Sequence, residues 1–209
     1  MKIAVVCANG KEGKCVVREA MDRGLDVTAV VRGENRSDAE KTIVKDAFDL
    51  TAADLKGFDV VVDAFGAWTP ETIPGIPAAV KHLCGLLRGG ETRLVIVGGA
   101  GSLYVNSEHT LCVADGPDFP EAFKPLAAAH DEALKFLRTQ KDVRWTYVSP
   151  AADFQADGAR TGGYTLGGEE LLLNAAGESV VSYADFAIAM VDEVISGAHV
   201  GQRISVVSK

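Results

Sequence analysis

A glycine-containing turn near the start of the chain has the sequence features of an anion-binding site. It follows a short apolar run at 3–6, which predicts a buried strand, and it precedes helical spacing over 14–23. Backbone N–H groups at such a helix start can bind a pyrophosphate, and Gly10 lacks the Cβ that would keep the phosphate away. Gly13 would let the helix pack close to the strand. An isolated glycine motif also fits a plain turn of another α/β fold. The residues of the predicted phosphate site are Ala8, Asn9, Gly10, Lys11, Glu12 and Gly13.

Two residues of this turn depart from the dinucleotide pattern Gly-x-x-Gly-x-x-Gly. Cys7 stands at the position of the first glycine, and cysteine does not favour positive φ as glycine does. Glu12 brings a negative charge near the expected phosphate, which Lys11 and Lys14 offset only in part. Both departures are expected to weaken cofactor binding.

The end of the second predicted strand, over 26–32, carries the signal for cofactor choice. In dinucleotide-binding folds an acidic residue in this region bonds the ribose of NAD, whereas an arginine accommodates the 2′-phosphate of NADP. Here the strand ends in Arg32, and Arg36 is a second phosphate contact within reach. The sequence therefore favours NADP, as NADPH, over NAD. A solvated strand end is the alternative interpretation of Arg32.

The elements that must position these residues alternate along the chain. Helical spacing predicts helices at 14–23, 75–87, 121–139 and 182–195, with a short one at 34–41. Apolar runs predict strands at 3–6, 26–32, 42–45, 58–65, 93–97, 144–148 and 203–207. This alternation is typical of a Rossmann-like α/β fold with a doubly wound parallel sheet, formed here by one domain over 1–209. An irregular insert at about 151–181 should lie on the substrate side, and ligands should bind where the strands end.

Composition narrows the function classes. A net charge of −8 and the absence of a lysine or arginine cluster argue against nucleic acid as a partner. No apolar run reaches 18 residues and no secretory signal is present, so we expect neither a membrane span nor export. Four separated cysteines and isolated histidines predict reduced thiols in the cytoplasm and no metal site.

With these features placed, the chain resembles the atypical short-chain dehydrogenase/reductase superfamily. Within it, the chain is most similar to the small NAD(P)H-binding, NmrA-like proteins often named NADH-flavin reductases. The resemblance implies that the glycine turn holds the pyrophosphate and that Arg32 holds the 2′-phosphate. It also implies a place near the adenine for Asp46 and Ala47. The resemblance rests on the glycine turn, on 27–32, and on 46–49, 60–66, 94–100, 145–150, 161–164 and 183–187. By the same resemblance, the residues near the ribose and nicotinamide are Ala64, Phe65 and Gly66.

The usual proton donor of short-chain dehydrogenases is absent from the sequence. None of the four tyrosines is followed four residues later by the lysine of a Tyr-x-x-x-Lys pair. Hydride transfer to a flavin, a quinone or a similar planar small molecule needs little acid help, so it is the favoured activity. Ser102 and Tyr104 are the candidates to orient such an acceptor, although a turn hydroxyl explains Ser102 equally well. Phe65 and Trp68 could stack on a planar ring, but core packing is the more favoured interpretation of both.

The missing Tyr-x-x-x-Lys pair also favours a second hypothesis, in which the chain senses NADP(H) and acts through a partner without turnover.

The glycine-rich segment 161–168 is open to two interpretations, a mobile substrate lid or packing against a second copy in a homodimer. Asp63 lies in an apolar strand and should need a hydrogen-bond partner if it is buried. His130 is interpreted as a solvated or capping residue of its helix.

Overall fold

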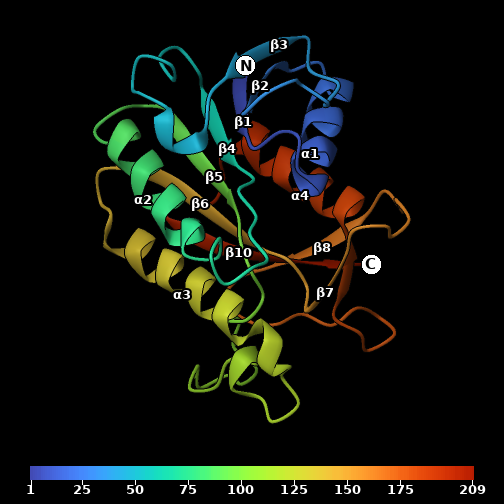
Figure 1. Ribbon diagram of the computed structural model, residues 1–209. Coiled ribbons are helices and arrows are strands. Elements are labelled where there is room, and N and C mark those ends of the chain that lie inside the picture. The colour runs from blue at the N-terminus through green and yellow to red at the C-terminus, as the bar shows by residue number, and fades with distance from the viewer.

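A mostly parallel sheet of eight strands forms the centre of the computed structural model, which describes residues 1–209 (Figure 1). The strand order is β3-β2-β1-β4-β5-β6-β10-β8, and only the edge strand β8 runs antiparallel to its neighbour. The sheet strands are β1 (Lys2–Val6), β2 (Asp26–Val31), β3 (Lys41–Val44), β4 (Val60–Asp63), β5 (Arg93–Val97), β6 (Arg144–Ser149), β8 (Tyr164–Gly167) and β10 (Gln202–Ser208). This confirms the predicted Rossmann-like α/β fold.

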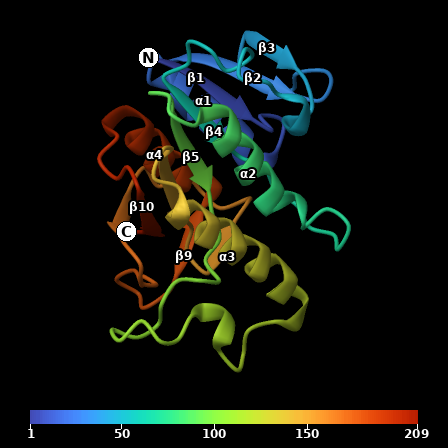
Figure 2. The same ribbon diagram turned by 90° about the vertical axis from the view of Figure 1, so that its left-hand side faces the viewer.

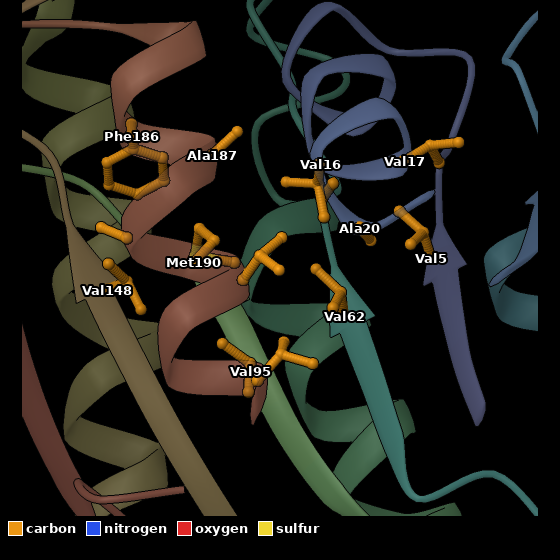
Figure 3. Packing of buried hydrophobic residues seen from close by; sticks show 14 of the residues in the cluster. Val5, Val16, Val17, Ala20, Val62, Val95, Val148, Phe186, Ala187 and Met190 are labelled. Atoms are coloured by element: carbon orange, nitrogen blue, oxygen red, sulfur yellow. The ribbon is translucent and has the colours of Figure 1, made fainter. Parts of the chain in front are cut away.

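Two helices cover each face of the sheet. The helices α1 (Lys11–Asp22) and α4 (Tyr183–Ser196) pack on one face, and α2 (Gly75–Leu87) and α3 (Lys124–Thr139) pack on the other (Figures 1 and 2). Successive strand residues point to opposite faces, so β1 needs apolar residues at nearly every position. Val5 accordingly faces α1 and α4, whereas Val6 faces α2 and α3. Figure 3 shows the first of these two cores, where side chains of α1 and α4 meet valines of the sheet.

The segment between β6 and α4 is the irregular insert that the sequence predicts. Besides β8, it contains β7 (Asp153–Gln155), which pairs in parallel with β9 (Val180–Ser182) in a small second sheet. Three short 3-10 turns complete the described elements: η1 (Ala47–Asp49), η2 (Val113–Asp115) and η3 (Glu121–Phe123). The insert ends at Ser182, whose hydroxyl caps α4 by accepting from the N–H of Asp185.

Several local predictions were wrong. Residues 34–41 form no helix, because the Asn35 side chain bonds the Ala39 carbonyl and the Ser37 N–H in place of a helical ladder. The α3 helix begins at Lys124, three residues later than expected, with η3 leading into it. The insert strands β7 and β9 are only three residues long and carry no periodic signal.

The parallel strands bring their carboxyl ends to one edge of the sheet, and this rim carries the loops that the sequence selects. The order reverses between β1 and β4, which defines the switch point where ligands of such sheets bind. No helix has both the length and the apolar character needed to cross a bilayer.

Candidate functional site

The glycine turn lies at the switch point and is built for close backbone approach. Gly10 is the N-cap of α1 and offers no capping side chain, so the first N–H groups of the helix remain free for an anion. A Cβ on Gly13 would lie 2.5 Å from the Cys7 carbonyl oxygen, and one on Gly10 would lie 3.1 Å from the same atom. The packing therefore requires glycine at position 13, whereas a side chain at position 10 would need the Cys7 carbonyl to move by a few tenths of an ångström.

Cys7 adopts the left-handed conformation of the glycine that it replaces, with φ of +61°. The turn is intact, because the N–H of Gly10 donates to the Cys7 carbonyl at 2.9 Å. Burial, and then the nearby Asp63 carboxyl, raise the pKa of the Cys7 thiol to about 12. The thiol is thus uncharged at neutral pH and adds no negative charge to the phosphate turn.

Glu12 does not place a charge beside the expected phosphate, which corrects the sequence-based expectation. Its side chain is buried, at 8 % exposure, rather than pointing to the rim. Burial raises its pKa well above the usual value, which favours the uncharged acid. Glu12 therefore repels a bound anion less than an ionised glutamate would.

Asn9 joins the glycine turn to the loop that follows β2. Its side-chain amide donates to the Glu34 carbonyl at 2.8 Å and accepts from the N–H of Arg36 at 2.6 Å. These two bonds hold the turn and the proposed 2′-phosphate residues in one unit. Asn9 is consequently a bracing residue of the site, a role that its sequence position alone did not reveal.

Four exposed cations surround this unit: Lys11, Lys14, Arg32 and Arg36. None of them forms a salt bridge, although most other lysines and arginines of this acidic chain do. A pocket of about 270 Å³ opens beside them. Its lining comes from the first turns of α1 and from the loop after β2: Lys14, Cys15, Arg18, Arg36, Ser37 and Asp38.

The residues expected near the adenine and ribose lie on the same rim. Asp46 caps η1 by accepting from the Phe48 N–H at 3.0 Å, and Ala47 is buried behind it. Ala64 lies beside the turn, since a Cβ on Gly10 would be 4.0 Å from the Ala64 carbonyl oxygen. Gly66, two residues further along, is exposed in the loop after β4.

The two aromatic candidates have different environments. Phe65 packs edge-to-face with Phe48 at 5.7 Å and against Gly75, where an added Cβ would lie 2.7 Å from the ring. Trp68 is 68 % exposed, so the core-packing interpretation is wrong for it. Trp68 thus presents an open ring surface to solvent.

Asp63, the last residue of β4, is the buried acid that the sequence singles out. Its carboxylate accepts from the Phe65 N–H at 3.0 Å, which supplies the expected partner and fixes the loop after β4. Burial raises the pKa of Asp63 to about 6, an effect that this hydrogen bond opposes. The group therefore titrates close to physiological pH.

Ser102 and Tyr104 make contacts with the far edge of the sheet and none with the glycine turn. Arg203 of β10 donates to the Ser102 carbonyl at 2.9 Å and to its Oγ at 3.0 Å, and it also bonds Glu169. The Tyr104 ring stacks on His109 at 4.4 Å, while its backbone bonds Glu169 and Leu171. These contacts tie the loop after β5 to the insert.

A contact that the sequence interpretation missed, between the buried Tyr147 and the half-buried His130, holds the start of the loop after β5. His130 Nδ1 lies 3.1 Å from the Tyr147 hydroxyl, which accepts from the Gly99 N–H at 3.1 Å. Burial lowers the pKa of His130 to about 4, so the ring is neutral and the solvated interpretation is wrong. The signal was present in Gly98-Gly99, because a Cβ on Gly99 would lie 2.9 Å from the His130 ring.

The segment 161–168 is bonded to the helix α4. The carboxylate of Asp185 accepts from the N–H groups of Thr161 and Gly162 and from the Thr161 hydroxyl. The Tyr164 hydroxyl donates to Asp192 at 2.8 Å. Such bonds do not favour the mobile lid that the glycines suggested.

No group of three or more His, Cys, Asp or Glu side chains is placed to hold a metal ion.

The fold and the glycine turn together define a Rossmann-like dinucleotide-binding protein. A family model described as NAD(P)H-binding matches residues 7–194. The chain belongs to this NAD(P)H-binding family, which supports an oxidoreductase-like protein with a nicotinamide cofactor.

The chain is also similar to proteins of known sequence or structure. The uncharacterised protein YwnB of Bacillus subtilis is 41 % identical over 211 residues, which cover 100 % of this chain and 99 % of YwnB. A Streptococcus pneumoniae protein provisionally described as an NADH-flavin reductase has a crystal structure with a TM-score of 0.98 and 52 % identity over all of both chains. A wide-type short-chain dehydrogenase/reductase of Veillonella parvula, solved with NADP, has a TM-score of 0.67 and 16 % identity over 99 % of this chain and 94 % of that one. The last similarity shows the fold alone.

Proposed function

We propose that the chain binds NADPH in preference to NADH and transfers its hydride to a planar small molecule of the flavin or quinone class. The observation that carries the proposal is the cluster of unpaired cations at the glycine turn. In a chain of net charge −8, four such cations favour a ligand with several phosphates. Arg32 and Arg36, both beyond β2, are the residues that would hold a 2′-phosphate.

The acceptor class follows from the groups available near the rim. When bound, the cofactor supplies the hydride, and the protein supplies binding and orientation. A flavin or quinone ring spreads the added charge and can take its proton from solvent, so a Tyr-x-x-x-Lys pair is not needed. The exposed ring of Trp68 and the partly buried ring of Phe65 are the candidate stacking surfaces. The name given to the Streptococcus pneumoniae relative points to the same class.

Paired titrations test the cofactor part of the proposal. NADPH and NADH are titrated into wild type, Arg32→Ala and Arg36→Ala, and binding is followed by tryptophan fluorescence or thermal shift. Removing a charge that bonds the 2′-phosphate should weaken NADPH binding by about tenfold or more and leave NADH binding nearly unchanged. Lys141→Ala, an exposed lysine without a salt bridge, is the control. Equal losses for both nucleotides would remove the case for a 2′-phosphate site.

The contacts of Ser102 and Tyr104 favour a second candidate, an NADP(H) sensor without turnover. The Ser102 hydroxyl already accepts from Arg203 and the Tyr104 ring stacks on His109, so both candidates are engaged away from the glycine turn. Steady-state NADPH oxidation with FMN, a quinone and a dye separates the two candidates. A sensor binds NADPH and accelerates none of these reactions.

A further inference from the structure

Glu12 is a buried carboxyl group without a hydrogen-bond partner. Neither Oε1 nor Oε2 has one, and the residue is 8 % exposed. Buried polar groups are nearly always hydrogen-bonded, because leaving them unpaired costs free energy. A leucine would fill a similar volume without that cost. Packing alone therefore does not explain a carboxyl group at this position.

The side chain lies where the N-terminal ends of α1 and α4 meet. Burial and then the Glu12 carboxyl raise the pKa of Cys15 to about 11, and the same two causes raise the pKa of Tyr183, the first residue of α4. The ring of Phe154 packs on Tyr183 at 4.1 Å between centroids. Figure 3 shows the two helices side by side, with Val16 facing the α4 side chains. No cation offsets the burial of Glu12 at this junction.

The junction between α1 and α4 lies on the side of the phosphate turn that is away from β2. A dinucleotide crosses the rim at the switch point between β1 and β4. Under the proposed function, Arg32 and Arg36 after β2 mark the adenosine side. The α4 helix packs on β5 and β10, across the switch point from β2. Glu12, the second residue of α1, therefore lies on the side of the turn where the nicotinamide would extend.

We propose that Glu12 is a positioning residue that pairs with the carboxamide of the nicotinamide ring. A carboxamide has N–H donors and one carbonyl acceptor, and a protonated carboxyl has a donor and acceptors, so the two groups pair reciprocally. Both Glu12 oxygens are covered, and contact requires the side chain to turn towards the rim. Because the side chain has no hydrogen bond in its resting position, this turn breaks none. The inference rests on the proposed binding of NADPH.

Two ligands that differ only in the nicotinamide provide the test. NADPH and 2′-phospho-ADP-ribose share the adenosine, the 2′-phosphate and the diphosphate, and calorimetry gives the affinity of each. Glu12→Leu should weaken NADPH binding by about tenfold, the effect of one lost hydrogen bond, and leave 2′-phospho-ADP-ribose binding unchanged. Glu12→Gln, whose amide also pairs with a carboxamide, should retain most of the NADPH affinity.

The outcomes separate the inference from the function on which it rests. Equal weakening of both ligands by Glu12→Leu, or no weakening of either, would overturn the role of Glu12 while nucleotide binding stands. Wild type that binds neither ligand would overturn the proposed function and the inference with it. Glu12→Leu should fold at least as stably as wild type, because it removes an unpaired buried group, and thermal melting checks this. Tyr183→Phe alters the same junction without touching the carboxyl and should leave both affinities unchanged.

Discussion

The two halves of the sheet rim use their polar residues differently. On the β1–β3 half, the cations around the glycine turn have no acidic partner, and glycines keep the backbone open. On the β6–β10 half, Arg203, Asp185 and Glu169 bond segments of the insert and of the loop after β5 to one another. A polar group that already has a partner gains little from a ligand, whereas an unpaired one gains a new interaction. The comparison supports the proposal that the ligand binds at the first half, while the bonds of the second half hold the insert in place.

Substituting Gly13 should have the largest effect on this comparison. In Gly13→Ala the new methyl group would lie 2.5 Å from the Cys7 carbonyl oxygen and 3.0 Å from the Ala8 Cα, and both are backbone atoms. The turn must shift, so we expect a stability loss of about 1–3 kcal/mol and loss of measurable NADPH binding. Urea unfolding and fluorescence titration measure the two effects.

Gly33→Ala is the matched control for Gly13→Ala. It makes the same substitution in the loop after β2, where an added Cβ meets nothing within 4 Å. Stability and NADPH binding should both remain close to wild type. If Gly13→Ala bound NADPH as tightly as Gly33→Ala, the turn would not be the phosphate site.

Arg203→Met should destabilise the β6–β10 half of the rim without changing nucleotide binding. Arg203 is 3 % exposed and bonds both Ser102 and Glu169, so its loss removes hydrogen bonds to these half-buried acceptors and should cost about 1–2 kcal/mol of stability. NADPH affinity should be unchanged, because Arg203 contacts no residue of the glycine turn. Chemical unfolding and nucleotide titration on the same preparation test both statements.

Arg138→Met supplies the comparison for Arg203→Met, because Arg138 bonds the same Glu169 carboxylate from an exposed position. An exposed ion pair contributes at most about 1 kcal/mol. Comparable losses from the two variants would mean that the buried contacts of Arg203 do not hold this half together.

The same contrast explains which features were predictable from the sequence. The helix Gly75–Leu87 and the strand Arg93–Val97 matched the expected bounds, because their apolar spacing reports burial directly. The position of the rim could be predicted from the alternation of strands and helices alone, since parallel strands end at one edge of the sheet. The environment of His130 depends on the β6 strand and the loop that pack beside its helix, and that of Glu12 depends on α4. Residue type does not encode these neighbours. Ser102 was a candidate by position, and its bond to Arg203 joins residues 101 positions apart in the chain.

Cys7→Gly should have the smallest effect of these substitutions, and it tests whether Cys7 restricts the phosphate turn. Glycine relieves the cost of φ at +61°, about 1 kcal/mol, but it loses the packing of a partly buried thiol and adds freedom to the unfolded chain. These effects oppose one another, so stability should change by less than about 1 kcal/mol, and NADPH affinity should not change. Cys7→Val, in contrast, places a β-branched side chain at positive φ and should lose both stability and binding. A marked gain of NADPH affinity in Cys7→Gly would show that the cysteine restricts the phosphate turn, and the unpaired cations would then surround a site that this chain has partly closed.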